Sequence, residues 1–392
     1  MKYIKRTIQP ALKNALNIFP VVSLCGPRQS GKTTLCRREF PEMRYVNLED
    51  YSTRIFAQDD PNGFLNQFQN GVIIDEAQLV PELFSQIQVI VDEDRFRDNH
   101  DRKFILTGSS NFSLLPNLRQ SLAGRMGMYT LLPLSCRELF EAGYSESVED
   151  YILKGGYPAI WDNPSEFRTE ILNNYIETYV ERDVRRLLEV KDLKKFTTFL
   201  RLCAARIGSE LNKSSMAVEL GISVPTIERW ISALEASFVI YLIQPWAENI
   251  GKRLTKTPKL YFTDTGIACT LLGIQTADHL MGHPLRGALF ENLVINNVVK
   301  DIYNHGKRET LYFYRDKTGR EIDLIREDKG KIEAVEIKAG KSFNPDFLRN
   351  IRYLKSIIND RLKISKVVYS GDFEFDKEEE GVLNYLNYPT IR

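Results

Sequence analysis

Residues 21–34 read Val-Val-Ser-Leu-Cys-Gly-Pro-Arg-Gln-Ser-Gly-Lys-Thr-Thr, an apolar run followed by a glycine, four further residues and then Gly-Lys-Thr. This order predicts a strand, a phosphate-binding loop and a helix. Gly26 and Gly31 allow the backbone angles at which successive N–H groups point at a phosphate. Lys32 would place a positive charge on the β and γ phosphates of ATP, and the Thr33 hydroxyl would bind Mg²⁺. The predicted ATP-binding residues are Gly26, Pro27, Arg28, Gln29, Ser30, Gly31, Lys32, Thr33 and Thr34. The alternative is that the glycines form only a plain turn without a ligand.

Length and composition predict a soluble protein of several domains. The chain has 392 residues, and its 53 Lys and Arg balance 52 Asp and Glu, so no overall charge points to nucleic acid or to a membrane surface. The five cysteines form no Cys-x-x-Cys pair, which argues against a disulfide framework or a zinc site. No apolar signal core follows Met1, and no run of about eighteen apolar residues occurs. We therefore expect a cytoplasmic protein without a membrane partner.

A second apolar run, residues 71–76, reads Gly-Val-Ile-Ile-Asp-Glu. Consecutive β-branched residues fit a strand that is buried on both faces of a parallel sheet. The strand would deliver two carboxylates to its carboxyl end. Asp75 would complete the Mg²⁺ shell, mostly through water, and Glu76 would orient or deprotonate the attacking water.

A further buried strand is predicted within residues 103–111, and it ends in small polar residues. In a P-loop ATPase a polar side chain at this position senses the γ-phosphate; Thr107, Ser109 and Asn111 are equal candidates, and a plain turn is the alternative. Arg125 follows in the segment Leu-Ala-Gly-Arg. It could act on the γ-phosphate from the same chain or from a neighbouring subunit, or form only a surface salt bridge.

Alternating strands and helices over residues 1–145 predict an α/β domain with a parallel sheet covered by helices on both sides. Residues 146–265 change to helical periodicity, which includes a helix predicted over residues 173–188. Residues 214–231 have helix-turn-helix spacing, with a turn at Gly221 and a second helix capped by Ser223. The side chains expected outside are Lys213, Thr226, Glu228 and Arg229, and those expected inside are Ala217, Leu220, Ile227 and Ile231. Strands at 242–245 and 260–263 could form a wing, used either for DNA binding or only as a lid or protein contact.

The C-terminal domain, residues 266–392, combines a helix with three predicted strands. Because side chains alternate along a strand, Asp323 from one strand and Glu336 from another could converge on a single Mg²⁺. Lys338 would lie beside them to polarise water or stabilise developing charge, and Glu291 from the helix could be a fourth member. This is the arrangement of a metal-dependent phosphodiesterase, whereas a strand with a charged, solvated face is the alternative.

The order of motifs along nearly the whole chain resembles a bacterial and archaeal family that joins an AAA-type P-loop ATPase to a C-terminal domain of unknown function. That domain is similar to the restriction-endonuclease, or PD-(D/E)xK, fold. The matching segments are GPRQSGKTTL, VIIDEAQLVPELF, LTGSSN, LAGR with LLPLSCREL, GGYP, the helix 175–186, LGISVPTIERWISALE, KLYFTDTG, FEN, GREIDL and VEIKAGK. The resemblance implies ATP binding and hydrolysis by residues 26–34 with Asp75 and Glu76, a candidate arginine finger at Arg125, and nuclease-like residues at Asp323, Glu336 and Lys338.

The sequence therefore predicts an ATP-binding and ATP-hydrolysing protein whose nucleotide state changes how a winged helix and a nuclease-like tail engage a target. ATP and Mg²⁺ are the expected ligands, and DNA, a second copy of the chain or another protein are the candidate partners. Two alternatives remain open: a Mg²⁺-dependent DNA nuclease gated by ATP, and a regulatory module that binds DNA or protein without cleavage.

Overall fold

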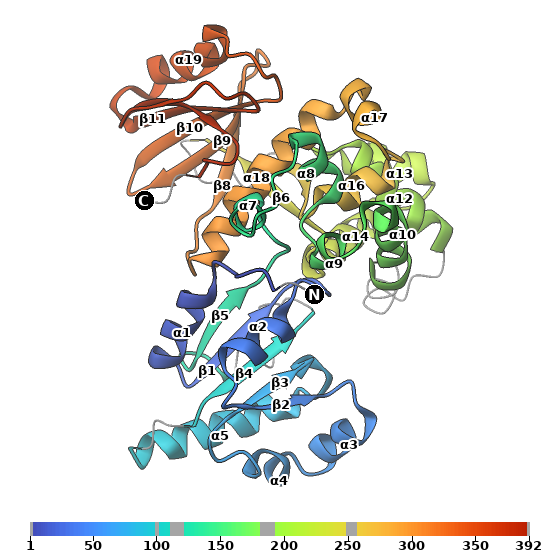
Figure 1. Ribbon diagram of the computed structural model, residues 1–392, viewed down its shortest axis with the longest axis vertical. Coiled ribbons are helices and arrows are strands. Elements are labelled where there is room, and N and C mark those ends of the chain that lie inside the picture. Colours follow the sequence, from blue (N-terminus) through green and yellow to red (C-terminus); the bar gives the residue numbers. More distant parts are fainter. Residues whose placement is uncertain (1–2, 99–101, 110–120, 181–192, 248–256, 390–392) are drawn as a thin grey trace.

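The computed structural model describes residues 3–98, 102–109, 121–180, 193–247 and 257–389. A body built around a parallel sheet lies at one end of the molecule, helices lie beside it, and a second sheet lies at the other end (Figure 1). The N-terminus lies at the junction between the first body and the helices. Within the described residues no helix is both long and apolar enough to span a membrane.

The N-terminal body alternates strands and helices, as predicted. The phosphate-loop strand and helix lie where the motif places them. The elements are α1 (Gln9–Ile18), β1 (Val21–Cys25), α2 (Lys32–Glu39), β2 (Arg44–Asn47), α3 (Tyr51–Asp59), α4 (Pro61–Asn66), β3 (Val72–Asp75), η1 (Ala77–Leu79), α5 (Glu82–Phe96), β4 (Phe104–Gly108) and β5 (Met126–Thr130).

The strands of this sheet follow the order β2-β3-β4-β1-β5, and each neighbouring pair is parallel. Its two faces are both apolar: Val21 packs in a cluster with Leu83 of α5, whereas Val22 packs with Leu12 of α1. The apolar runs are therefore buried on both sides, which is typical of a parallel sheet between helices. Because β4 lies between β1 and β3, the carboxyl ends of these strands meet at one edge.

Helices form most of the next region, and its helix-turn-helix has the turn and the cap that the sequence predicts. Gly221 adopts a left-handed conformation with φ of 59° at the end of α13, and the Ser223 side chain caps α14 by accepting from the Thr226 N–H. The predicted helix over 173–188 is described only as far as Val180, and its remainder lies outside the described residues. The elements are α7 (Cys136–Glu141), α8 (Val148–Lys154), α9 (Pro158–Asp162), η3 (Ser165–Phe167), α10 (Arg168–Tyr175), η4 (Ile176–Val180), α12 (Leu193–Ala205), α13 (Lys213–Leu220) and α14 (Val224–Ala236).

The C-terminal part contains a mixed sheet with the strand order β12-β13-β11-β10-β9-β8-β6-β7. Helix α18 lies on one side, where Leu293 and Val335 share a core, and α19 lies on the other, where Leu354 packs with Val367. The elements are β6 (Ile240–Pro245), β7 (Lys259–Phe262), α16 (Thr265–Leu271), α17 (Ala277–Gly282), α18 (Arg286–Asn304), β8 (Leu311–Arg315), β9 (Glu321–Asp328), β10 (Lys331–Lys338), η5 (Pro345–Leu348), α19 (Arg349–Ile358), η6 (Asn359–Arg361), β11 (Leu362–Tyr369), β12 (Phe375–Asp376) and β13 (Glu380–Asn384).

The expected wing strands pair with each other but do not form a free hairpin. Strands β6 and β7 are antiparallel, and β6 also pairs in parallel with β8 through Gln244 opposite Tyr312. The hairpin is therefore an edge of the C-terminal sheet, and this sheet contains strands from both sides of residue 265.

Candidate nucleotide-binding site and C-terminal carboxylate cluster

The loop between β1 and α2 has the backbone that the glycines predict. Gly26 has φ of 154°, and a Cβ atom there would lie 2.1 Å from the carbonyl oxygen of Leu131. Gly31 has φ of 96° and immediately precedes helix α2. Larger residues would thus clash at Gly26 and strain the backbone at Gly31, so both glycines are required by the local geometry.

Lys32 lies inside this loop. Its Nζ donates to the carbonyl oxygens of Gly26 and Pro27, both at 2.8 Å, and the side chain is buried. Burial lowers the pKa of the Lys32 ammonium, while the carboxylates of Glu76 and Asp75 act in the opposite direction. The lysine is therefore held at the loop by weak acceptors that a phosphate oxygen could replace.

Asp75, at the carboxyl end of β3, accepts hydrogen bonds from three hydroxyl groups. The Thr33 Oγ1 and the Tyr45 hydroxyl each donate to Asp75 Oδ2 at 2.8 Å, and Thr107 Oγ1 donates to Asp75 Oδ1. Thr33 and Asp75, the two residues predicted to hold Mg²⁺, are thus in direct contact. Tyr45 was not predicted, although its position on the neighbouring strand β2, two residues before the strand's end, could have suggested it.

Glu76 follows Asp75 with a left-handed backbone, φ of 54°. Its Oε2 accepts from Ser109 Oγ at 3.1 Å and from the Gln78 amide. Burial raises the pKa of Glu76, and the positive charge of Lys32 partly opposes that rise. Of the predicted γ-phosphate sensors, Thr107 contacts Asp75 and Ser109 contacts Glu76, whereas Asn111 lies outside the described residues.

Arg6 supports the phosphate loop from the N-terminal segment, a role that the sequence did not reveal. Its guanidinium donates to the carbonyl oxygens of Ser30 at 2.8 Å and Leu132 at 2.7 Å, and its Nε lies 3.2 Å from Glu138 Oε1. Burial alone would raise the pKa of Glu138, but Arg6 and backbone N–H groups lower it. The buried ion pair thereby ties the loop to the start of α7.

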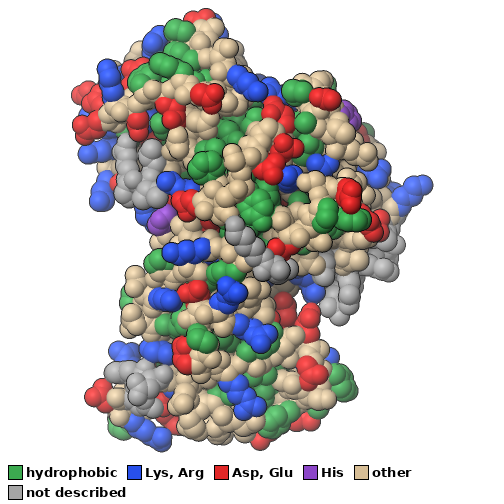
Figure 2. All heavy atoms as spheres, in the orientation of Figure 1, with side chains coloured by type: hydrophobic (Ala, Val, Ile, Leu, Met, Phe, Trp, Pro, Cys, Tyr) green, Lys and Arg blue, Asp and Glu red, His purple; other side chains and the backbone are tan. Residues whose placement is uncertain are grey.

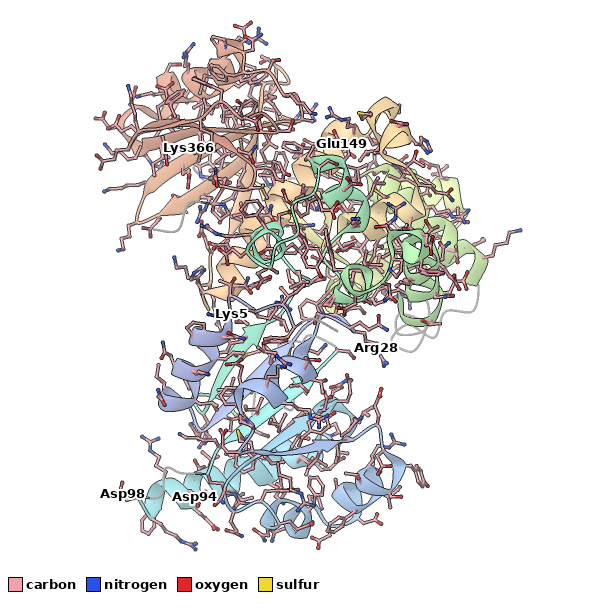
Figure 3. The ribbon with its side chains drawn as sticks, in the orientation of Figure 1. Lys5, Arg28, Asp94, Asp98, Glu149 and Lys366 are labelled. Carbon is pink, nitrogen blue, oxygen red and sulfur yellow. The ribbon has the colours of Figure 1, made fainter. Side chains whose placement is uncertain are left out.

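The helical region touches the same loop through two tyrosines. The Tyr175 hydroxyl donates to the carbonyl oxygen of Arg28 at 3.3 Å, and the Tyr157 hydroxyl donates to that of Tyr175 at 2.9 Å. Arg28 lies at the junction of the two regions (Figure 3) and pairs with Glu49 at 3.5 Å. A change in the loop backbone that moves the Arg28 carbonyl would therefore alter this hydrogen bond to the last residue of α10.

A cavity of about 180 Å³ adjoins the start of α2. The loop, the N-terminal segment and α9 all contribute to its wall, and the Arg38 guanidinium lies over the Tyr3 ring at 4.2 Å. Its lining residues are Tyr3, Ile4, Arg6, Gly31, Thr34, Arg38, Leu134, Pro158 and Asp162.

Arg125 lies at the opposite edge of the sheet from the phosphate loop. Its carbonyl oxygen accepts from the N–H of Val21, the first residue of β1, and Cys25 at the loop is about 13 Å further along the strand at ~3.3 Å per residue. The guanidinium forms a two-point ion pair with Asp92 at 2.7 and 2.8 Å. Arg125 therefore does not reach the phosphate loop of its own chain in this structure, and its action on a γ-phosphate stays a prediction.

The structure brings together the predicted C-terminal residues. Lys338 Nζ lies 2.5 Å from Glu336 Oε2 and 3.3 Å from Asp323 Oδ2, which also accepts from the Ile337 N–H. Burial and the nearby Asp323 carboxylate raise the pKa of Glu336 to about 8. Within the described residues no group of three or more His, Cys, Asp or Glu is arranged to hold a metal ion.

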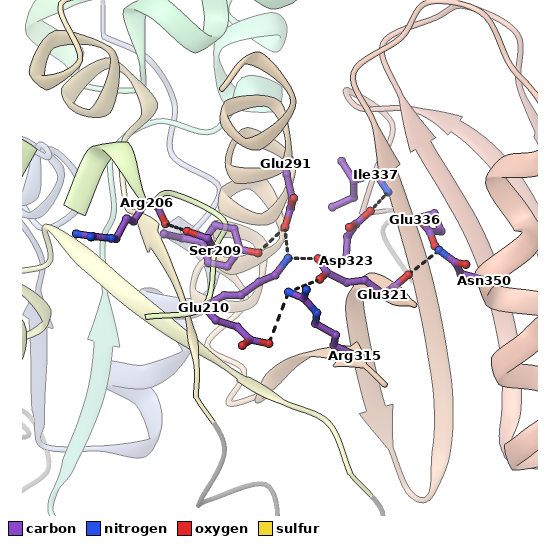
Figure 4. A network of polar contacts seen from close by, with 12 residues as sticks. Arg206, Ser209, Glu210, Glu291, Arg315, Glu321, Asp323, Glu336, Ile337 and Asn350 are labelled. Carbon is purple, nitrogen blue, oxygen red and sulfur yellow. Dashed lines mark hydrogen bonds and ion pairs between the residues drawn. The ribbon is translucent and has the colours of Figure 1, made fainter. Parts of the chain in front are cut away.

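Glu291 and Glu321 extend this group into what we call the C-terminal carboxylate cluster: Glu291, Glu321, Asp323 and Glu336 (Figure 4). Glu291 of α18 accepts from Lys259 Nζ and from the Tyr261 hydroxyl. Burial and Asp323 raise the pKa of Glu291 to about 7. Both donors come from β7, so the expected wing strand takes part in the cluster.

The outward face of the helix-turn-helix has no marked excess of basic side chains. Glu228 forms an ion pair with Lys213 at 2.9 Å, and Glu219 pairs with Arg206. On the face of the molecule in Figure 2, Lys and Arg are interspersed with Asp and Glu, as the balanced composition predicts. DNA binding by this element stays a prediction.

Three family models match the chain: an AAA domain over residues 19–140, a domain of unknown function (DUF8612) over 145–278, and a second one (DUF4143) over 286–391. Among solved structures, the Walker-type ATPase PABY2304 of Pyrococcus abyssi is similar with a TM-score of 0.46 and 16% identity, covering 67% of this chain and 94% of that one. The Orc1 protein of Aeropyrum pernix, solved in complex with DNA, has a TM-score of 0.28 and 12% identity, covering 67% and 91%.

Two mycobacterial proteins are similar over most of the chain. "Uncharacterized protein Rv2008c" of Mycobacterium tuberculosis and "Uncharacterized protein Mb2031c" of Mycobacterium bovis are each 30% identical over 378 residues, which is 95% of this chain and 81% of theirs. The chain therefore belongs to the family of these two proteins, and its N-terminal part is an AAA-type P-loop ATPase domain.

Proposed function

We propose that the protein binds ATP with Mg²⁺ at the loop 26–34 and hydrolyses it there. One observation carries this proposal: Thr33 and Thr107 both donate to Asp75, directly beside the buried Lys32. A buried cation, a hydroxyl and a carboxylate at one end of a strand-loop-helix are what a triphosphate and its metal require.

The residues present fit a metal-bound triphosphate. Ser30 Oγ is buried in the loop without a hydrogen-bond partner among the described residues, so it is free to meet a ligand. Thr33 and Asp75 would hold Mg²⁺, which when bound neutralises charge on the β and γ phosphates. The cavity beside Gly31 and Thr34 would receive the nucleobase against Ile4, Leu134 and Pro158.

Within this arrangement each side chain has a defined task. Lys32 would exchange its bonds to Gly26 and Pro27 for phosphate oxygens. Glu76, held by Ser109 and Gln78, would orient the attacking water and accept its proton. The raised pKa of Glu76 makes its carboxylate a stronger base than an ordinary Glu.

The substitution Glu76→Gln tests this assignment because it preserves shape and removes the basic group. We expect ATP affinity within about threefold of wild type and a loss of turnover of at least about 100-fold. Glu82→Gln, on the solvent-facing first turn of α5, is the matched control. Turnover that survives Glu76→Gln would reject Glu76 as the base while leaving ATP binding in place.

A second function, metal-dependent phosphodiester cleavage by a restriction-endonuclease-like C-terminal domain, is favoured by one observation. Glu336 and Asp323 are both buried, and Lys338 Nζ contacts the two carboxylates at 2.5 and 3.3 Å, so they lie side by side. Mg²⁺ is commonly bound by one or two carboxylates together with water and substrate phosphate, so Asp323 and Glu336 suffice to hold it. Bound there, the metal would polarise a phosphate oxygen, and Lys338 would orient the attacking water.

Plasmid DNA incubated with Mg²⁺ or Mn²⁺, with and without ATP, tests this second function. We expect cleavage by the wild type and none by Asp323→Ala. DNA binding in a gel-shift assay with steep salt dependence but without cleavage would instead support a regulatory binding module. Cleavage that is equal in wild type and Asp323→Ala would contradict the assignment.

A further inference from the structure

Lys259, on strand β7, is the buried cation of the C-terminal carboxylate cluster. Its side chain is 2% exposed, and its Nζ lies 3.1 Å from Glu291 Oε1 and 2.5 Å from Glu321 Oε1. The ring of Phe313 lies 5.3 Å away and covers another side of the ammonium. Removing an ammonium from water is costly unless carboxylates compensate it, so the lysine and the two carboxylates hold one another in place.

The ammonium is adjacent to the proposed metal position. Glu321 and Asp323 are two residues apart on β9, and Glu291 approaches them from α18 (Figure 4). A metal ion held between Glu291 and Glu321 would need the space that the Lys259 ammonium fills.

Enzymes that cleave phosphodiesters often use two divalent ions about 4 Å apart, held by shared carboxylates. In this cluster one pair of carboxylates, Asp323 and Glu336, faces Lys338, whereas Glu291 and Glu321 are bound to Lys259. Lys338 is partly exposed and can turn away toward solvent. Lys259 is enclosed, and its backbone is fixed by pairing with Ile243.

We propose that Lys259 supplies a built-in positive charge in the place of a second divalent ion, so that the carboxylate cluster binds a single metal. The inference rests on the metal site proposed above for Asp323 and Glu336. It also makes the cluster dependent on the β6–β7 hairpin, because Lys259 and Tyr261 reach it from outside the predicted C-terminal domain.

Mn²⁺ binding to the full-length, nucleotide-free protein tests the proposal, with free Mn²⁺ counted by electron paramagnetic resonance. Asp323→Ala measures ions bound elsewhere, and this number is subtracted. We expect one ion in the wild type and in Lys259→Arg, and two in Lys259→Met. Lys366→Met, which removes an equally buried ammonium from β11 in the same sheet, should leave the count at one.

The remaining outcomes overturn the role of Lys259, the metal site or both. A folded Lys259→Met that binds one ion or none overturns the role of Lys259 and leaves the wild-type metal site standing. Two ions in the wild type, after the Asp323→Ala count is subtracted, overturn the role of Lys259 as well. No ion in the wild type overturns the metal site and the inference together. If thermal unfolding shows that Lys259→Met is not folded, Lys259→Gln replaces it with the same expected count.

Discussion

Thr33 and Asp75 are 42 residues apart in the sequence, and a hydrogen bond of 2.8 Å joins the Thr33 hydroxyl to Asp75 Oδ2. The contact exists because β3 and β1 are parallel and separated by β4, so their carboxyl ends meet at one edge of the sheet. This pair is the proposed Mg²⁺ site of the ATPase domain.

Thr107→Val keeps the shape of the side chain and removes the hydroxyl that donates to Asp75 Oδ1. A hydrogen bond to a charged group contributes about 1.5–3 kcal/mol, so kcat should fall by about 10- to 100-fold if Asp75 is misplaced in the transition state. The KM for ATP should change little. Ser23→Ala is the control, because Ser23 Oγ is equally buried in β1 but has no partner among the described residues. An unchanged kcat would show that Thr107 does not position Asp75.

The pH dependence of ATP hydrolysis follows from Glu76. Burial raises its pKa above the ordinary value for Glu of about 4.3, and only the ionised carboxylate can accept a proton from water. Activity should therefore be lost as pH falls through this raised pKa, beginning at a higher pH than an ordinary Glu would allow. We expect kcat/KM to show this acidic decline while ATP binding, measured at each pH, is retained. A profile that stays flat down to pH values near 4.3 would contradict it.

Arg6→Met removes the buried guanidinium that binds Ser30, Leu132 and Glu138. Because Glu138 is then a buried charge without its cation, the free energy of unfolding should fall by about 3–5 kcal/mol. Adding Glu138→Leu should recover only part of that loss, because it removes the unpaired charge but leaves the Thr7 and Ser135 N–H groups without their acceptor. Urea denaturation of the two variants measures both effects. A loss below about 1 kcal/mol in Arg6→Met would show that the Arg6 contacts contribute little to stability.

Tyr175→Phe removes the hydroxyl between the phosphate loop and α10. We expect ATP turnover within about threefold of wild type, because the hydroxyl donates to the Arg28 carbonyl and accepts from the Tyr157 hydroxyl, and neither of these groups is assigned a catalytic role. The change in hydrogen exchange of α10 on ATP addition should be reduced, since that contact transmits the movement of the loop. Tyr144→Phe, whose hydroxyl donates to the carbonyl of Trp161 within the helical region, is the control. An ATP response in α10 that equals wild type would exclude this route.

The phosphate loop and its carboxylates could be predicted because each is encoded by adjacent residues. Gly26 to Thr34 are contiguous, and Asp75 and Glu76 end a short apolar run, so local patterns determine both. The helix-turn-helix was predictable for the same reason, since Gly221 and Ser223 set its turn locally.

The contacts that were missed are those between distant segments. Arg6 meets Glu138 across 132 residues, and β6 meets β8 through Gln244 and Tyr312. No local pattern encodes such pairings, which depend on how whole elements pack. The position of Arg125 could have been foreseen, because a residue that begins a parallel strand lies at the edge opposite the strand ends that form the loop.

The central claim is that Lys32 and the loop hold Mg²⁺-ATP. Lys32→Ala tests it most directly when ATP binding and phosphate release are measured together in the presence of Mg²⁺, with Lys13→Ala, an exposed lysine of α1, as the control. The account predicts that wild type and Lys13→Ala bind and hydrolyse ATP, whereas Lys32→Ala loses binding, turnover or both. Equal binding and turnover in Lys32→Ala and wild type, or no ATP or ADP retained by the wild type, would contradict it.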